Sequence, residues 1–522
     1  MPNTYDVIII GSGFGGAVTA CRQAERGQKV LILERGRRWD AKNYPREPHD
    51  PWIYDQNSPA KYNGWLDFNF LGDSKMTVVT GAGVGGGSLA YANVSMIPPA
   101  RSFAEGWPPE IKYEELLPYF DTVGKMLNVQ KIPQDQLKNT YKLTREAADR
   151  LGYGDRFEAL ELAISFDPEW NPNAPDPFGD QHSKKFINAQ GVEQGTCVHS
   201  GNCDVGCQVK AKNTLDLNYL AVAERKGAEI RPLHLARRIK PENNGYRVFY
   251  DVIKDGQLIP GSEAADKVII AAGSIGSTEL LLRSRDQYKT LPKLSRFLGH
   301  DWSSNGDFLT PAIYAQRDIS IWEGPTITGG INFLQDGIDG HRFTIEDGGA
   351  PNFLLNWLQA ERARGEKVSI LVKELNKLLT PESRHNMLWF ANGVDAANGR
   401  LYLKRVWYAP WRRRLHLNWE IQKSKALFNA ILKMHTRLSE ATGGKVEISP
   451  LWEYFNLLIT PHPLGGCNMG QSEANGVVNH LGEVFGYKNL YVADGSIVPE
   501  AIGINPSRTI AALAERIVEH MT

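Results

Sequence analysis

The sequence has little cysteine, no net charge and no long apolar run. Five of its 522 residues are Cys, an odd number that argues against a disulfide framework and favours reduced thiols. Lys plus Arg and Asp plus Glu both total 59, so no strong overall field would attract nucleic acid. No run of about 18 apolar residues predicts a membrane-spanning helix. The N-terminus also lacks the pattern of a secretory signal, which favours a cytoplasmic location.

The length of the chain exceeds what one compact core normally holds. Ordinary domain sizes predict two or three closely connected units for 522 residues. No internal repeat and no long low-complexity run separates them, so the domain boundaries have to be inferred from motifs.

The N-terminal segment has the pattern of a complete βαβ unit. The apolar run Val7–Ile10 predicts a buried parallel strand, residues 17–26 predict a helix that Gly27 ends, and residues 29–34 predict a second strand ending in Glu34. A glycine loop between strand and helix lets backbone amides approach a pyrophosphate, and Glu34 would accept hydrogen bonds from ribose hydroxyls. A purely structural strand-helix turn is the alternative. The candidate loop residues are Gly11, Gly13, Phe14, Gly15 and Gly16.

Three later segments resemble further pieces of a nucleotide site. Residues 81–88 hold more glycine than a turn needs, which predicts backbone amides against a phosphate or a flat ring. Residues 268–277 predict a buried strand that turns through small residues into a helix at 278–283, and residues 490–496 predict a strand ending in an acid and a glycine. The candidate cofactor contacts from these segments are Gly81, Gly83, Gly86, Gly87, Ser88, Ala272, Gly273, Asp494 and Gly495.

Two motifs near the C-terminus bracket the last of these strands. Residues 461–467 read PHPLGGC and residues 503–506 read GINP, so both His462 and Asn505 could face one cofactor. An imidazole titrates near neutrality and can accept or hold a hydroxyl proton, and an amide can donate to a substrate oxygen. A structural histidine is the alternative for His462. Helix capping is the alternative for Asn505, because Pro506 suits the first position of a helix over 507–516.

Together these segments resemble the glucose-methanol-choline (GMC) flavoprotein oxidoreductases, and the stretch from His462 to Pro506 is most similar to the cholesterol oxidase branch. The resemblance implies an α/β fold: a Rossmann-like FAD-binding domain with a mostly parallel sheet, discontinuous in sequence, plus a substrate domain with an antiparallel sheet covered by helices. We expect residues 1–105, 205–300 and 461–522 in the first domain, and residues 106–204 and 301–460 in the second.

The resemblance also implies roles for individual residues. In the cholesterol oxidase branch a histidine and an asparagine that match His462 and Asn505 face the flavin. The branch also has a substrate-domain glutamate, and loose local similarity around Thr344–Glu346 suggests Glu346 for this role. Asn93 and Pro506 are expected among the FAD contacts. The segment Tyr91–Asn93 departs from the more glycine-rich sequence of the sterol enzymes, which leaves the substrate open.

The resemblance implies FAD-dependent oxidation of an alcohol to a ketone or aldehyde by hydride transfer to flavin N5. The expected substrate is a sterol or another bulky apolar alcohol, and the electron acceptor is either dioxygen or a redox partner. Two alternatives stay open. The chain could be the flavin subunit of an electron-transfer dehydrogenase, or a flavin-binding protein without catalytic activity.

The first alternative depends on a cysteine loop. Cys197, Cys203 and Cys207 have the spacing C-x5-C-x3-C on a glycine-bearing loop, which could hold a three-iron cluster. With His199 the same loop could bind zinc. Reduced structural cysteines are the favoured interpretation.

Residues 301–460 alternate polar and apolar side chains in short runs. Examples are residues 401–403 and 415–419, and the pattern predicts the antiparallel sheet of the substrate domain. Residues 404–414 mix basic and aromatic side chains on a predicted hairpin, which could touch an anionic membrane surface or a partner. A solvated loop is the favoured interpretation of this stretch.

Overall fold

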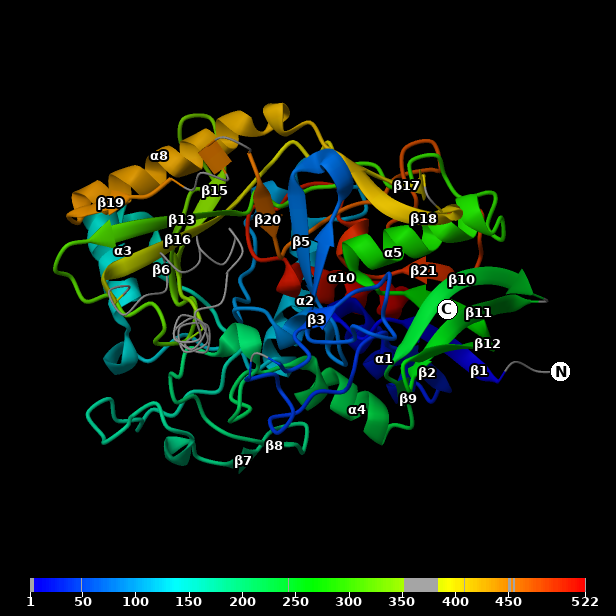
Figure 1. Ribbon diagram of the computed structural model, residues 1–522, viewed down its shortest axis with the longest axis horizontal. Helices are drawn as coiled ribbons and strands as arrows, with labels where there is room; N and C mark the ends of the chain where they lie inside the picture. The colour runs from blue at the N-terminus through cyan, green and yellow to red at the C-terminus, as the bar shows by residue number, and fades with distance from the viewer. Residues whose placement is uncertain are drawn as a thin grey trace.

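The N-terminal apolar run forms a central strand of a parallel sheet in the computed structural model (Figure 1). The structure describes residues 4–47, 49–242, 244–351, 384–407, 409–448, 452–453 and 456–521. Strand β1 pairs in parallel with β12 and β2, and β9 and β21 extend the parallel part. Val7, Ile8 and Ile9 are completely buried, as expected for a strand covered on both faces. The seven strands are β1 (Tyr5–Ile10), β2 (Val30–Leu33), β9 (Glu229–Arg231), β10 (His234–Glu242), β11 (Gly245–Lys254), β12 (Gln257–Ile270) and β21 (Leu490–Val492).

One side of this sheet continues as an antiparallel meander that the sequence analysis did not identify. The first part of β12 pairs with β11, and β11 pairs with β10, both in antiparallel register. The second part of β12, from Ala265 to Ile270, pairs with β1. One long strand therefore joins the meander to the parallel sheet.

The helices of this half are α1 (Phe14–Glu25), α2 (Tyr113–Met126), α4 (Tyr219–Arg225), α5 (Gly273–Leu282) and α10 (Ser507–His520). The helices predicted at 17–26, 278–283 and 507–516 are present as α1, α5 and α10, each with at least one shifted end. Helix α1 contacts α4 and α10, and α10 also contacts α2. Helix α5 begins five residues before the predicted start at Thr278. Its glycines are poor helix formers, but the Asp494 carboxylate accepts a hydrogen bond from the Gly273 N–H at 2.8 Å and so holds the first turn.

A second, antiparallel sheet forms the other half of the molecule. Its strand order is β19-β13-β16-β15-β14-β6, and helices α3 and α8 pack against it. This confirms the predicted mixed fold with an antiparallel sheet covered by helices. The elements are β6 (Phe157–Ala159), β13 (Phe308–Tyr314), β14 (Gly329–Asn332), β15 (Phe343–Gly348), β16 (Asn386–Gly393), β19 (Gly444–Val446), α3 (Asn139–Arg150) and α8 (Lys425–Ala441).

The runs at 401–403 and 415–419 do not join this sheet, so that prediction was wrong. They pair with each other in a separate hairpin of β17 (Arg400–Val406) and β18 (Ala409–Asn418), in which β17 contacts α5 of the nucleotide half (Figure 1). The hairpin itself was expected. Alternation in a sequence shows that one face of a strand is buried, but it does not identify the surface that buries it.

A small mixed sheet of four strands brings distant segments of the chain together. It contains β3 (Ile53–Tyr54), β4 (Leu66–Phe70), β5 (Met76–Gly81) and β20 (Leu458–Thr460), and β20 pairs in parallel with β5. This pairing places the segment just before His462 beside the segment that enters the second glycine loop. The remaining described strands are β7 (Phe186–Ile187) and β8 (Glu193–Gln194), which pair with each other.

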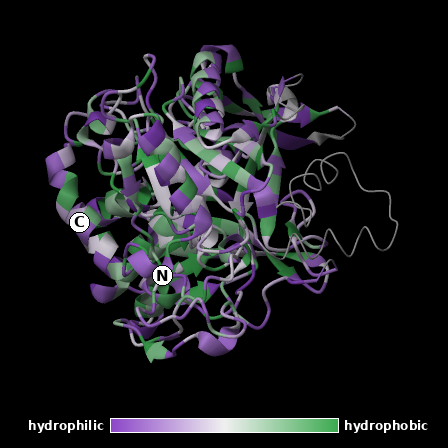
Figure 2. Cartoon of the chain, turned by 90° about the vertical axis from the view of Figure 1, so that its left-hand side faces the viewer, coloured by the Kyte–Doolittle hydropathy of each residue, from purple (hydrophilic) through white to green (hydrophobic). Residues whose placement is uncertain are grey.

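Hydrophobic residues lie mainly among the inner strands, and hydrophilic residues lie mainly at the periphery (Figure 2). No helix within the described ranges is both long and apolar enough to cross a membrane. The division into residues 1–105, 205–300 and 461–522 and residues 106–204 and 301–460 stays a proposal.

The tight contact between α1 and the end of β21 gives a stability prediction. A Cβ at Gly15 would lie 1.5 Å from the Ala493 carbonyl oxygen, whereas a Cβ at Gly13 would meet nothing closer than 4.0 Å. We expect Gly15→Ala to destabilise the protein by more than about 3 kcal/mol, because the backbone must move apart. Gly13→Ala is the matched control and should unfold like the wild type in cofactor-free protein. Equal thermal midpoints for the two variants would contradict this packing.

Candidate active site

The four glycine-bearing segments surround a single cavity. It has a volume of about 500 Å³ and lies between the strand ends of the parallel sheet and the antiparallel sheet. Both His462 and Asn505 reach its wall. The predicted residues that line it are Gly11, Gly13, Phe14, Gly15, Glu34, Gly81, Gly86, Gly87, Ala272, Gly273, His462, Asp494, Gly495, Asn505 and Pro506.

Three predicted residues lie behind the wall and hold its loops. A Cβ at Gly16 would come within 2.1 Å of the Gly11 carbonyl oxygen, so Gly16 permits the close helix-strand packing expected of it. The Gly83 carbonyl accepts a hydrogen bond from the Ser12 hydroxyl at 3.3 Å. The Ser88 hydroxyl donates to the Gly85 carbonyl at 2.7 Å, which closes the second glycine loop on itself.

Glu34 is held with its carboxylate at the cavity wall. One carboxylate oxygen accepts from the Ser12 N–H at 3.1 Å and from the Ser12 hydroxyl at 2.6 Å, and the other accepts from the Gly36 N–H at 2.8 Å. Only 4% of Glu34 is exposed. Since a carboxylate has about four acceptor positions, this one can accept a further hydrogen bond from a ligand hydroxyl.

Asn93 also lies just behind the wall, between the lining residues Ala92 and Val94. Its backbone has a φ of 69°, and its side-chain oxygen and nitrogen are both buried without a hydrogen-bond partner among the described residues. A buried amide without partners costs about 1–3 kcal/mol. This cost is removed if a polar group of a bound ligand meets the amide.

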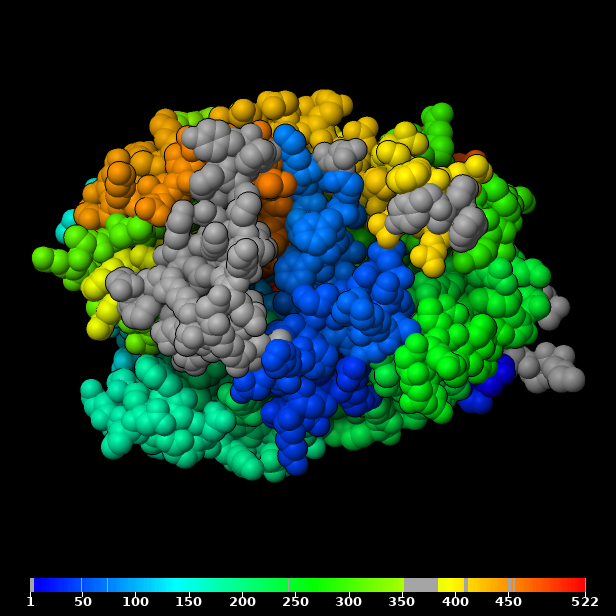
Figure 3. Space-filling view, in the orientation of Figure 1, coloured from blue at the N-terminus to red at the C-terminus, as the bar shows by residue number. Residues whose placement is uncertain are grey.

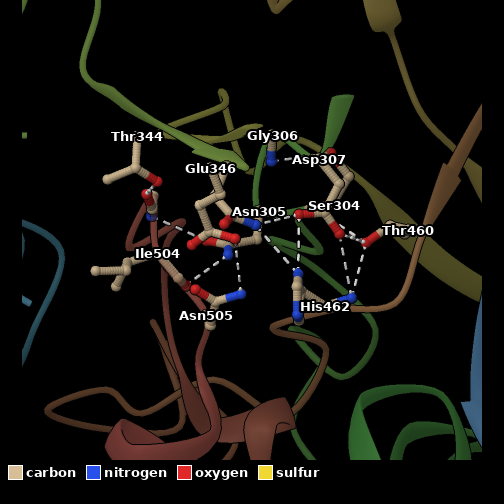
Figure 4. Close-up of polar contacts among 12 residues, drawn as sticks. Ser304, Asn305, Gly306, Asp307, Thr344, Glu346, Thr460, His462, Ile504 and Asn505 are labelled. Carbon is tan, nitrogen blue, oxygen red and sulfur yellow. Dashed lines mark hydrogen bonds and ion pairs between the residues drawn. The ribbon is translucent and has the colours of Figure 1, made fainter. Parts of the chain in front are cut away.

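His462, Glu346 and Asn505 come together from three distant segments (Figure 4). His462 follows β20, Glu346 lies in the middle of β15, and Asn505 precedes α10. The Asn505 amide donates weakly to a Glu346 carboxylate oxygen at 3.5 Å. Glu346 is only 1% exposed, so it meets the cavity through the two side chains that line it.

Asp307 fixes the orientation of the His462 ring. Its carboxylate accepts a hydrogen bond from His462 Nδ1 at 3.0 Å and also accepts one from the Asn392 amide. The backbone N–H of His462 donates to the Thr460 hydroxyl at 3.0 Å. These contacts occupy Nδ1 and leave Nε2 as the ring nitrogen that a ligand in the cavity can meet.

The charges around His462 favour its protonated form. Burial alone would lower its pKa, but the charge of Asp307 and the hydrogen bond to it outweigh burial, and the charge of Glu346 acts in the same direction. The pKa of His462 is therefore raised. A protonated imidazole at this position donates a hydrogen bond from Nε2.

Burial has the opposite consequence for Glu346. Loss of hydration raises the pKa of its carboxyl group to about 8, although the charge of His462 and the Asn505 amide both oppose the rise. A carboxyl group with this pKa is close to half ionised in mildly alkaline solution. It can hold or release a proton near physiological pH.

Asn505 does not cap helix α10, which was the alternative role considered for it. Pro506 occupies the N-cap position of α10, and no side chain caps this helix. A buried asparagine, Asn305, instead holds the loop that carries Asn505. Its oxygen accepts from the N–H groups of Ile502 and Gly503 at 3.1 and 2.9 Å, and its nitrogen donates to the Ile504 carbonyl at 2.9 Å.

The sequence analysis missed both Asp307 and Asn305. They lie on one turn, Ser303–Asp307, just before β13. Its composition, Ser-Ser-Asn-Gly-Asp, predicts a turn and nothing more. Only the fold brings its two polar ends against two separate segments of the site.

Comparison with known proteins identifies the family. Two models described as GMC oxidoreductase match residues 5–159 and 397–514. The chain belongs to the GMC oxidoreductase family. Over 99% of its length this GMC protein is 30% identical to a cholesterol oxidase from Acinetobacter baumannii, of which it covers 94%. It is 29% identical over 99% of its length to a cholesterol oxidase from Mycobacterium tuberculosis, of which it covers 91%.

Solved structures agree with this fold. The crystal structure of pyridoxine 4-oxidase from Mesorbium loti superimposes with a TM-score of 0.63 at 17% identity, covering 99% of both chains. Family membership makes this GMC protein an FAD-dependent oxidoreductase that acts on alcohols.

The cavity of this GMC protein suits FAD. The glycines around it let backbone N–H groups approach phosphates, and Glu34 keeps acceptor positions for a hydroxyl. The side-chain amide of Asn93, just behind the wall, has no hydrogen-bond partner among the described residues. The Asn505 side-chain oxygen is likewise buried without a hydrogen-bond partner in the described part of the protein.

The cysteine loop has a structural arrangement. Cys197 Sγ accepts from the His199 N–H at 3.4 Å, and Cys207 Sγ accepts from the Ala211 N–H at 3.2 Å. Both ring nitrogens of His199 meet protein oxygens, those of Gly324 and Gln136, at 2.9 and 3.0 Å. All five cysteines are free thiols. No group of three or more His, Cys, Asp or Glu side chains in the described ranges is placed to hold a metal ion, so neither the iron-sulfur nor the zinc alternative gains support.

The wall at Gly13 gives a prediction for cofactor retention. A Cβ at Gly13 would have open space around it in the protein alone, and Gly13 lines the cavity between the first and second glycine loops. We expect Gly13→Ala to fold normally but to retain less than about a tenth of the FAD, since the methyl group keeps a phosphate from the backbone amides. The ratio of flavin to protein absorbance after purification measures this. A full complement of FAD would contradict the assignment.

Proposed function

We propose that this GMC oxidoreductase oxidises a sterol or a similarly bulky apolar alcohol, with His462, Glu346 and Asn505 as its catalytic residues. One observation carries the proposal. Three polar side chains from distant segments lie together, with His462 and Asn505 in the wall of a largely apolar cavity and Glu346 just behind it. Burial raises the pKa of Glu346 to about 8, and the charge of Asp307 and the hydrogen bond to it raise the pKa of His462 against the effect of burial.

The proposed FAD site uses the glycine-bearing segments on the other walls of the cavity. Gly13 and Gly86 would admit the pyrophosphate, and Glu34 would accept from the ribose. Asp494, whose carboxylate already accepts from the Gly273 N–H and the Ser277 hydroxyl, would hold the neighbouring backbone in place. When bound, FAD supplies the acceptor for the hydride that leaves the carbinol carbon.

The three catalytic side chains would divide the remaining work. His462 is oriented by Asp307, which also raises its pKa, and in its protonated form it would donate from Nε2 to the alcohol oxygen and fix its position. Glu346 lies just behind the cavity wall and, in its carboxylate form, would take up the hydroxyl proton that the alcohol loses as its carbon gives up the hydride, so the alcohol leaves as a ketone or aldehyde. This assigns the base to Glu346, whereas the sequence alone suggested His462.

Asn505 would link the proton acceptor to the cofactor side. Its nitrogen donates to Glu346, and its buried oxygen has no hydrogen-bond partner among the described residues. Asn505 lines the cavity next to Pro506, at the positive end of α10. The helix end favours negative charge that develops nearby. Asn305 and Asp307 would act as positioning residues, because each one holds a neighbouring segment and not the reacting atoms.

The substrate side of the cavity supports a bulky apolar alcohol. Its lining there includes Leu309, Ile327 and Phe390 with the small residues Gly348 and Gly349. The proposal of a sterol rests on this apolar lining and on the cholesterol oxidases among the relatives.

Anaerobic flavin reduction tests the proposed function. Mixing the holoenzyme with sterols, long-chain alcohols or sugars should bleach the flavin fastest with sterols. His462→Ala should slow bleaching by about 10²–10⁴-fold, because the alcohol oxygen is no longer held, without loss of bound FAD. His49→Ala, at an exposed position, is the control and should behave like the wild type. Reduction by sugars alone, or by none of these alcohols, would refute the proposed substrate class.

Glu346 gives a pH prediction with two measurements. Because the proposed base must be ionised, flavin reduction should accelerate with pH up to about pH 8 and then level off. Glu346→Gln should abolish this dependence and reduce the rate.

The same carboxyl group predicts how stability depends on pH. Since the pKa of Glu346 in the folded protein lies above the ordinary value of 4.5, the unfolded state releases this proton at a lower pH than the folded state does. The wild type should therefore lose stability as pH rises from about 4.5 to about 8.

Glu346→Gln should consequently lose less thermal stability over that pH range than the wild type. Exposed Glu447→Gln is the matched control and should follow the wild type in both measurements. Identical pH profiles for wild type and Glu346→Gln would exclude Glu346 as the proton acceptor.

A further inference from the structure

The β17–β18 hairpin concentrates positive charge that the proposed function does not use. Residues 400–418 contain six Lys and Arg residues and no Asp or Glu. Since the whole chain has a formal charge of zero, its remaining residues carry a formal charge of −6. The molecule is thus polarised, with one cationic projection on an otherwise acidic body.

The register of the hairpin places like charges opposite one another. Lys404 pairs with Arg414, and Arg405 pairs with Arg413. Like charges in directly opposed positions destabilise a sheet. None of these four side chains forms an ion pair within the described ranges, and Arg412 forms none either. No acidic side chain of the described residues pairs with these cations, so the exposed Lys404 and Arg414 can meet an anionic partner outside the protein.

The two faces of the hairpin differ in the way a docking surface requires. Leu401, Leu415 and Leu417 are buried on the inner face, and β17 contacts α5. The Arg283 guanidinium donates to the Arg413 carbonyl at 3.2 Å and so ties β18 to the body of the protein. The hairpin is therefore fixed in place and does not need to fold on binding.

The face that carries Lys404 and Arg414 also carries two half-buried rings, one of which, His416, lies against Gly72. Residues directly opposite each other share a face, so Lys404 and Arg414 lie on the same side as Tyr402 and His416, whose ring centroids are 5.9 Å apart. Lys404 and Arg414 are exposed. Trp407 lies at the turn between the strands and is 89% exposed, the highest value of any large hydrophobic residue that the structure describes. The strands lie at the upper right of the face shown in Figure 3.

We propose that this hairpin docks the protein on an anionic phospholipid membrane surface. Tryptophan side chains favour the headgroup level of a bilayer, and Lys and Arg next to them bind anionic headgroups. A protein partner would instead call for a flatter patch with an apolar centre. The acidic remainder of the molecule is repelled by the same surface, so the protein should bind in one orientation, with the hairpin toward the lipid.

Vesicle co-sedimentation of the holoenzyme tests this inference. We expect binding to phosphatidylcholine vesicles that contain about 30% phosphatidylglycerol, weak binding to phosphatidylcholine alone, and loss of binding at high salt. The double variant Lys404→Gln/Arg414→Gln should bind about 30-fold more weakly, because each cation near such a surface contributes about 1 kcal/mol. The matched control Lys142→Gln/Lys226→Gln removes two exposed lysines from other surfaces and should bind like the wild type.

The position of Trp407 is tested separately. Brominated phosphatidylglycerol should quench part of the tryptophan fluorescence in the wild type, and Trp407→Ser should remove that quenching. Ile187→Ser, at a side chain that is 65% exposed elsewhere, is the control. Flavin content and thermal midpoint report whether each variant is folded.

Three results would overturn the proposal. The first is equal binding of the wild type to neutral and anionic vesicles. The second is unchanged binding by Lys404→Gln/Arg414→Gln. The third is retention of the wild type on heparin without binding to anionic vesicles, which would indicate a polyanionic macromolecule as the partner. None of these results bears on oxidation of the alcohol, since no hairpin residue lies in the proposed catalytic group.

Discussion

The hydrogen bonds of the buried turn Ser303–Asp307 join the parts of the site that the chain supplies separately. Asp307 holds His462, which comes from the end of β20, and Asn305 holds the loop that carries Asn505. Both turn residues are almost completely buried, so these bonds form in surroundings where unmet polar groups are expensive. The position of one proposed catalytic side chain is thereby coupled to that of the other.

Burial of polar groups in the site also lowers the stability of the folded protein. Glu346 sits at 1% exposure beside a protonatable histidine, and its pKa is raised because water is excluded. Asn93 and Asn505 keep buried amide atoms without a partner among the described residues. Each feature destabilises the protein alone, and each becomes useful when a cofactor or substrate fills the cavity. The β17–β18 hairpin is a second case at the surface, where like charges face each other across the strands.

Local patterns predicted the nucleotide half well, since its signals are local. The glycines at 11–16 lie between one strand and one helix, where the backbone comes so close to its neighbours that few other residues fit. An acid such as Glu34 at the end of the next strand is the other part of this local pattern. The same reasoning located Asp494 and the start of α10. It placed the start of α5 too late, because the hydrogen bond from Gly273 to Asp494 joins residues more than 200 positions apart.

The sequence by itself determined the βαβ unit, the glycine loops, the two C-terminal motifs and hence the family. It also proposed His462, Asn505 and, through loose similarity, Glu346. Tertiary structure alone decided that Asp307 orients His462 and raises its pKa, that Asn305 replaces capping as the support of Asn505's loop, and that the 400–418 strands pack on α5. The reason is physical. A sequence motif reflects interactions between residues close together in the chain. The orientation, burial and pKa of a side chain depend on groups that are distant in the chain and that only the fold brings near.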